Sequence, residues 1–227
     1  MAGELPAPSG RLNQNAVRMS EFSSRYKTFL IFGAPGSGKG TVGKALGAIP
    51  RFFHQACGDV FRTLDTRTPL GQEFVRYSSQ GQLVPDELTV RLWKGRIDDE
   101  VRTHRFKPDI DFLVLDGIPR NVGQARLMEE HIDVLQVFHL SCPNREELKR
   151  RLRKRALKEN RWDDASDDVI DRRIKTYEDT SKPMLDHYHR HNVMDIDAGQ
   201  PPPKVLCDIL NRITNRPDWM EHIREDK

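Results

Sequence analysis

The sequence lacks long apolar runs and contains few cysteines. No stretch of its 227 residues approaches the roughly 20 apolar residues that a membrane-spanning helix needs, and its first 25 residues lack the apolar core of a secretory signal. Cys57, Cys142 and Cys207 lie far apart, without the paired spacing of a zinc site or a disulfide framework. We therefore expect a soluble protein in a reducing compartment, with no structural zinc.

A strong excess of charge of one sign is also missing. The formal net charge is +3 and the pI about 8.8, which alone does not indicate a nucleic-acid-binding protein. Hydrophobic residues make up 37% of the chain and charged residues 31%, enough apolar material for one core under a highly charged surface. The length suits one domain, so this composition favours a soluble enzyme that handles polar ligands.

Apolar runs alternate with helix-length segments along the chain. Such alternation predicts a parallel sheet covered by helices on both faces. Residues 59–104 form a helical stretch longer than one crossover requires, which indicates a small inserted subdomain. Residues 158–164 break a polar helical stretch at 145–188 and are expected to form a surface loop. The apolar runs are residues 28–32, 111–115, 134–140 and, more weakly, 193–196.

A glycine-rich segment directly follows the first apolar run and precedes a helix-compatible stretch. In this position, backbone amides and the positive end of the helix can converge on phosphate oxygens. Glycine is needed because side chains would block that approach, and Lys39 could reach the transferring phosphates. We therefore predict a nucleotide phosphate site here. The segment reads Gly33-Ala34-Pro35-Gly36-Ser37-Gly38-Lys39-Gly40-Thr41.

The end of this segment departs from most P-loops, because Gly40 follows Lys39 and the hydroxyl arrives at Thr41. The pattern Gly-x-Pro-Gly-x-Gly-Lys-Gly-Thr resembles the nucleoside monophosphate kinases, specifically the adenylate kinase and uridylate-cytidylate kinase group. The resemblance implies an α/β fold, with a P-loop NTPase-type parallel sheet and helices on both faces. It also implies a helical acceptor-binding insertion at about 57–86 and a short lid at about 155–165. The kinase domain would span 27–212, between a flexible leader at 1–26 and a C-terminal tail at 213–227.

Three further segments resemble the family's acceptor site. Cys57-Gly58-Asp59-Val60-Phe61-Arg62 is similar to Thr-Gly-Asp-x-x-Arg, and Gly81-Gln82-Leu83-Val84-Pro85-Asp86 to Gly-x-Leu-Val-x-Asp. Asp116-Gly117-Ile118-Pro119-Arg120 is similar to Asp-Gly-Phe-Pro-Arg, and Gln124 matches the glutamine that reads adenine in adenylate kinases. The AMP-binding residues implied are Cys57, Arg62, Gln82, Leu83, Val84, Gly117, Ile118, Pro119, Arg120, Gln124, Arg161 and Arg173.

The basic stretch at 145–158, in which eight of fourteen residues are cationic, has three interpretations. It could bind nucleic acid or form a solvated helix. The third is that Arg151, Arg155, Arg161 and Arg173 match the family's four lid-side arginines, with Arg172 as the alternative to Arg173 because one extra residue follows Asp164. The resemblance then implies ATP binding by Gly36, Ser37, Gly38, Lys39, Gly40, Thr41, Arg151, Arg155 and Gln200, and catalysis by Lys39, Arg120, Arg155, Arg161 and Arg173.

The implied reaction is reversible phosphoryl transfer from ATP to AMP, giving two ADP. Mg²⁺ would be held by Thr41 and by water that Asp116 orients. The resemblance implies a monomer whose partners are these nucleotides, with no nucleic acid or membrane partner. We expect it in the cytoplasm, with organelle import through the leader as the alternative. Two other functions stay open: a uridylate-cytidylate kinase, because Cys57 replaces threonine, and a P-loop nucleotide switch or nucleic-acid-binding protein.

Overall fold

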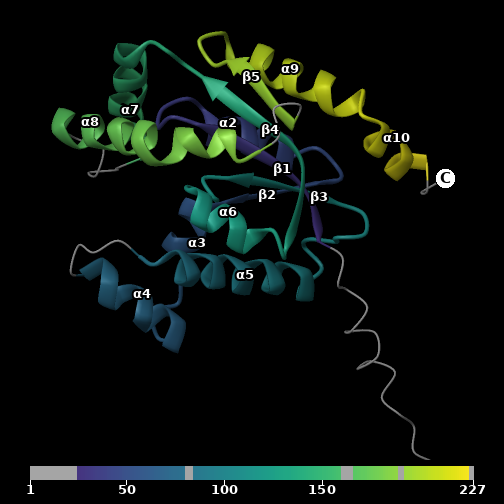
Figure 1. Ribbon diagram of the computed structural model, residues 1–227, viewed down its shortest axis with the longest axis horizontal. Coiled ribbons are helices and arrows are strands. Elements are labelled where there is room, and N and C mark those ends of the chain that lie inside the picture. Colours follow the sequence, from purple (N-terminus) through teal and green to yellow (C-terminus); the bar gives the residue numbers. More distant parts are fainter. Residues whose placement is uncertain (1–24, 80–83, 160–165, 189–191, 225–227) are drawn as a thin grey trace, which may run out of the picture.

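Five strands form one sheet in the computed structural model, which describes residues 25–79, 84–159, 166–188 and 192–224 (Figure 1). Their order is β2-β3-β1-β4-β5, and every neighbouring pair is parallel. The parallel sheet predicted from the alternating runs is therefore confirmed. The strands are β1 (Tyr26–Gly33), β2 (Phe52–Ala56), β3 (Phe112–Asp116), β4 (Ile132–Ser141) and β5 (Val193–Asp197).

Helices connect the strands and cover both faces of the sheet (Figure 1). None of the described helices is long and apolar enough to cross a membrane. A π-helical turn, η2 (Tyr177–Ser181), and a 3₁₀ turn, η3 (Lys182–Asp186), continue directly from α8. The helices are α2 (Lys39–Gly47), α3 (Cys57–Arg62), α4 (Pro69–Ser79), α5 (Asp86–Arg102), α6 (Val122–Met128), α7 (Arg145–Glu159), α8 (Asp167–Thr176), α9 (Pro202–Thr214) and α10 (Pro217–Arg224).

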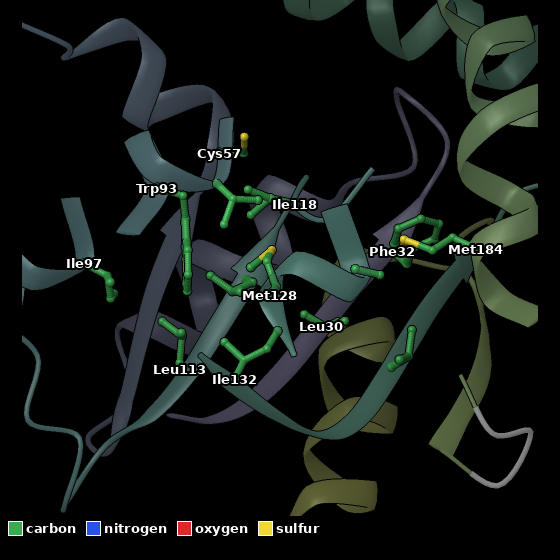
Figure 2. Packing of buried hydrophobic residues seen from close by; sticks show 14 of the residues in the cluster. Leu30, Phe32, Cys57, Trp93, Ile97, Leu113, Ile118, Met128, Ile132 and Met184 are labelled. Atoms are coloured by element: carbon green, nitrogen blue, oxygen red, sulfur yellow. The ribbon is translucent and has the colours of Figure 1, made fainter. Parts of the chain in front are cut away.

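Two apolar layers hold the helices on the sheet. On one face, α2 and α9 pack Leu46 and Ile209 against the phenylalanines of the strands. On the other face, α5, α6 and η3 pack Trp93, Met128 and Met184 against the sheet. Figure 2 shows this second layer, with Trp93 next to Ile118 and Phe32 against Met184. The sheet is thus buried on both sides, and its carboxyl edge is left to form a site.

No continuous apolar run marks β2 in the sequence, because His54 and Gln55 interrupt it. The structure accommodates His54 against α2 at two glycines. A Cβ atom added at Gly43 would lie 2.2 Å from Nε2 of His54, and one added at Gly47 would lie 2.6 Å from its Cβ. The polar side chain is therefore partly buried by a local fit to α2, which the apolar pattern of the strand does not reveal.

The two long helical stretches are confirmed and divided more finely. The first contains α3, α4 and α5. The second contains α7, α8, η2 and η3; α7 ends at Glu159, and Ser166 caps α8 by accepting a hydrogen bond from Val169 N–H. Most of the predicted surface loop and lid lies in residues 160–165, outside the described residues.

The C-terminal helices pack on the core. The expected domain boundary at residue 212 falls inside α9, and Ile213 just beyond it is fully buried. In α10, the ring of Trp219 stacks on Phe52 with centroids 5.2 Å apart and on Phe112 at 5.4 Å. At the other end, Tyr26 opens β1 and contacts Phe106 edge-on, whereas residues 1–24 lie outside the described residues.

We expect Trp219→Ala to lower the free energy of unfolding by about 2 kcal/mol, because the partly buried ring contacts two core phenylalanines. Chemical denaturation followed by circular dichroism measures this loss. The matched variant Trp219→Phe keeps an aromatic ring at this position and should cost less than half as much. Equal stability of Trp219→Ala and the parent chain would contradict the stabilising contact.

Candidate functional site

The glycine-rich loop connects the carboxyl end of β1 to α2. Gly36 and Gly38 adopt φ angles of 85° and 96°, which favour glycine, and Gly38 is the N-cap of α2. A Cβ atom at Gly36 would lie 2.9 Å from the carbonyl oxygen of Leu148, so the loop also packs closely on α7. Nζ of Lys39 folds back and donates to the carbonyl oxygens of Gly33 at 2.8 Å and Ala34 at 3.0 Å. The loop itself therefore fixes the position of the lysine.

The electrostatic environment of Lys39 is dominated by desolvation. Burial lowers the pKa of Lys39 to about 8, the carboxylate of Asp116 opposes this shift, and the positive charges of Arg155, Arg120 and Arg173 add to it. These arginines come from α7, from the loop after β3 and from α8. Cations far apart in the sequence thus act on one ammonium group.

A cavity of about 1010 Å³ lies over the loop at the carboxyl edge of the sheet. Fifteen of the predicted site residues line it, together with Asp59. The predicted residues that line the cavity are Gly36, Ser37, Gly38, Lys39, Gly40, Thr41, Arg62, Asp116, Gly117, Pro119, Arg120, Arg151, Arg155, Arg173 and Gln200.

Neighbouring groups orient three of the cavity arginines. Arg62 donates to Asp59 within α3. Nε of Arg120 donates to the carbonyl oxygen of Gly117 at 3.0 Å. Arg151 donates from Nη1 to the carbonyl oxygen of Ala198 at 2.8 Å, which ties α7 to the loop after β5. The arginines of the cavity are therefore held by at least three separate elements.

The phase of α8 distinguishes Arg173 from Arg172. Arg173 lines the cavity, whereas Arg172 is exposed and its Nε donates to the carbonyl oxygen of Asp168, one turn earlier in α8. Of the two alternatives left by the sequence, Arg173 is the one beside the loop.

Four predicted acceptor residues lie outside the cavity lining. Val84 is partly buried, whereas Cys57 and Ile118 are buried in the same core layer as Trp93 (Figure 2). Gln124 is 5% exposed; its Nε2 donates to Asp86 at 2.8 Å and its Oε1 accepts from Arg120 N–H at 2.9 Å. The remaining predicted residues, Gln82, Leu83 and Arg161, lie outside the described residues.

The basic face of α7 is divided between ion pairs and the cavity. Three of its cations, Arg145, Lys149 and Arg153, pair with other acids of α7, α8 or η2. Arg150 and Arg151 pair with Glu147 and also line the cavity. The hydrogen bonds from Arg150 and Arg151 lower the pKa of Glu147 to about 2. The pairs to other acids are Arg145–Glu178, Lys149–Glu146, Lys149–Asp171 and Arg153–Asp167.

Several residues of the cavity wall lie outside the motifs found in the sequence. Lys154 and Lys158 line it from α7, at four-residue spacing from Arg150. That spacing could have placed them on one helix face. Thr176, Tyr177 and Ser181 line it from the end of α8 and from η2, and no motif pointed to them.

Oxygen donors at the cavity fit a magnesium ion. Asp116 lines the cavity at the end of β3 and is 8% exposed, and Thr41 belongs to the same wall. A Cβ atom at Gly40 would lie 3.4 Å from Oδ2 of Asp116, so glycine keeps the loop backbone close to this carboxylate. Mg²⁺ takes few protein carboxylates and completes its shell with water and phosphate. Among the described residues there is no group of three or more His, Cys, Asp or Glu that could hold a metal ion.

Comparison with known proteins gives one consistent family. The adenylate kinase family model matches residues 31–193. Adenylate kinase of Cyanothece sp. is 36% identical over 188 residues, covering 79% of this chain and 91% of the relative. Adenylate kinase of Chlamydia muridarum is 32% identical, covering 81% and 86%, and that of Mycoplasma pneumoniae is 29% identical, covering 82% and 97%. Since the family model spans more than half of the sequence and these relatives align over most of their own length, the chain belongs to the adenylate kinase family.

Proposed function

We propose that this protein catalyses reversible, Mg²⁺-dependent phosphoryl transfer from ATP to AMP, giving two ADP. The main support is the convergence of Lys39 and the arginines of α3, α7, α8 and the loop after β3 on one cavity. Phosphoryl transfer needs positioning and charge neutralisation rather than a protein nucleophile. The volume of about 1010 Å³ is at the upper end of the range of roughly 300–1,000 Å³ for one ligand, which leaves room for two nucleotides end to end.

The donor would occupy the side of the cavity formed by the loop and α7. The loop amides and Lys39 would hold its phosphates, because the N-terminus of α2 points into the cavity. Arg151, tied to Ala198, would lie against the donor base, near Gln200. Arg155 and Arg173 would neutralise the phosphoryl group as it moves.

The acceptor would occupy the side formed by α3 and the loop after β3. Arg62 and Arg120 would hold its phosphate in line with the donor, since each guanidinium can bind a phosphate through two N–H groups. Asp59 would be displaced as the partner of Arg62 when phosphate binds. Gln124, which lies beneath this side of the cavity, would recognise the adenine base.

Magnesium completes this assignment. When bound, Mg²⁺ supplies charge neutralisation at the phosphates, and Thr41 and water oriented by Asp116 would hold it. Asp116 also opposes the lowering of the Lys39 pKa, so one carboxylate would interact with both Lys39 and the magnesium ion. Closure of the acceptor-binding insertion and the lid over both substrates would exclude water, which otherwise competes as acceptor. A monomeric state and a cytoplasmic location remain predictions of the resemblance.

We expect Lys39→Ala to lower kcat by at least roughly 100- to 1,000-fold without unfolding the protein, because it removes the ammonium group nearest the donor phosphates. AMP-dependent ADP formation and circular dichroism measure the two properties. Lys27→Ala, an exposed lysine of the same strand-loop-helix unit, is the matched control and should keep parental activity. Retained turnover in Lys39→Ala would refute the site.

The pKa of about 8 for Lys39 predicts an alkaline limb in kcat/KM for ATP. Above pH 8 the free enzyme loses the lysine proton, so kcat/KM should fall about tenfold per pH unit. The alkaline fall of kcat should occur at higher pH than that of kcat/KM, because bound phosphates favour the charged lysine. Nucleotide phosphates are already ionised in this range. A kcat/KM that stays flat to pH 9.5 would contradict the assignment.

We expect AMP to be at least tenfold better than UMP or CMP as acceptor, measured as kcat/KM with Mg-ATP as donor. Gln124→Ala should reduce this preference. Faster transfer to UMP or CMP would instead assign a uridylate-cytidylate kinase. ATP loss that requires RNA or DNA and not AMP would assign a nucleic-acid-dependent switch.

A further inference from the structure

A hydrogen-bonded chain of three side chains connects the outer edge of the sheet to the cavity wall. His139 of β4 is 8% exposed; its Nδ1 lies 2.5 Å from Oδ1 of Asp195, and its Nε2 lies 2.8 Å from the hydroxyl of Tyr177. Asp195 belongs to the edge strand β5 and its side chain is 75% exposed. Tyr177 lines the cavity. The transfer mechanism above uses none of these residues.

The roles of the hydrogen-bonding groups follow from Asp195. A carboxylate only accepts, so in the neutral imidazole the proton lies on Nδ1 and is donated to Asp195. Nε2 of His139 is then an acceptor and receives the hydroxyl proton of Tyr177. Burial and the nearby acids raise the pKa of Tyr177 to about 12, so this proton stays on the phenol through the neutral range. The hydrogen-bonding groups of the three side chains are therefore all paired in one arrangement.

The register of the strands places these three side chains directly beneath the P-loop. Phe32 of β1 pairs with His139, and His139 pairs with Asp195, so the three residues form one row across neighbouring strands. The ring of Tyr177 packs on Phe32 with centroids 6.1 Å apart. The residue after Phe32 is Gly33, whose carbonyl oxygen accepts from Lys39. Tyr177 is thus fixed to the same strand that supports the loop.

Tyr177 is also the point where α8 changes geometry. Its backbone N–H donates to the carbonyl oxygens of Arg173 and Ile174, and the next residues form the π-helical turn η2. π-helical turns are rare and occur frequently at functional sites. Arg173 lies one turn before Tyr177 and lines the same cavity, so the two residues project from the same end of α8.

We propose that His139 is a positioning residue for phosphoryl transfer: with Asp195 it anchors the hydroxyl of Tyr177, and this anchor holds the end of α8 that carries Arg173 over the cavity. The inference rests on the transfer reaction proposed above. It predicts that loss of the anchor lowers kcat more than it raises KM, because Arg173 would stabilise the phosphoryl group in the transition state rather than the bound substrates.

Tyr177→Phe removes only the hydroxyl and keeps the ring on Phe32. We expect it to lower kcat about fivefold with little change in KM for either nucleotide, since one hydrogen bond is lost. His139→Leu should have a similar effect. His139→Gln, whose amide can still donate to Asp195 and accept from Tyr177, should recover most of the loss. Tyr188→Phe removes a phenol just beyond η3 and outside the cavity lining, so it is the matched control and should leave kcat unchanged.

A double-mutant cycle separates this inference from the proposed function. If Tyr177 acts through Arg173, Tyr177→Phe should have no further effect in an Arg173→Ala background. A Tyr177→Phe variant that melts at lower temperature but keeps parental kcat would overturn the positioning role while leaving the proposed function intact. If the losses in kcat of the two single variants multiply in the double variant, the positioning role is overturned as well. An Arg173→Ala variant with parental kcat would overturn both the inference and the proposed role of Arg173.

Discussion

The burial of Lys39 among other cations is the constraint on which the site depends. Burial is the largest cause of the lowered pKa of Lys39; the positive charges of Arg155, Arg120 and Arg173 add to this shift, and the carboxylate of Asp116 opposes it. Two backbone carbonyl oxygens hold the ammonium group in this unfavourable surrounding. Phosphates that enter the cavity would relieve the repulsion among these cations. Because the cations are already held together in the empty cavity, this relief would increase the affinity for polyanions. A cavity of this kind favours ligands that carry several negative charges close together.

The parallel sheet makes this assembly of charges possible. The carboxyl ends of its strands meet at one edge, and the P-loop, Asp116 and Ala198 lie at the ends of three different strands there. Helices that start or end at the same edge bring the arginines in from segments far apart in the chain. The apolar layers on both faces keep the strands in register, so the distances between these charges do not depend on the loops alone.

The position of the glycine-rich loop and the strands β1, β3, β4 and β5 can be predicted from the sequence, because glycine spacing and apolar runs have direct physical causes. The sequence does not reveal β2, where His54 is accommodated by two glycines of the neighbouring helix. Arg172 and Arg173 differ only in helix phase, which depends on where α8 begins at its Ser166 cap. His139 and Tyr177 carry no motif, and their contact joins residues 38 positions apart, so only the folded chain brings them together.

The strand β5 has one further consequence at the edge of the sheet. An unpaired strand edge offers its N–H and C=O groups to any other extended chain, and such edges promote aggregation. β5 is only five residues long, and Asp195 and Asp197 are both exposed on it. A foreign strand pairing there would have to approach two carboxylates. Asp195 thus has a second effect besides orienting His139: together with Asp197, it protects the open side of the sheet against intermolecular pairing.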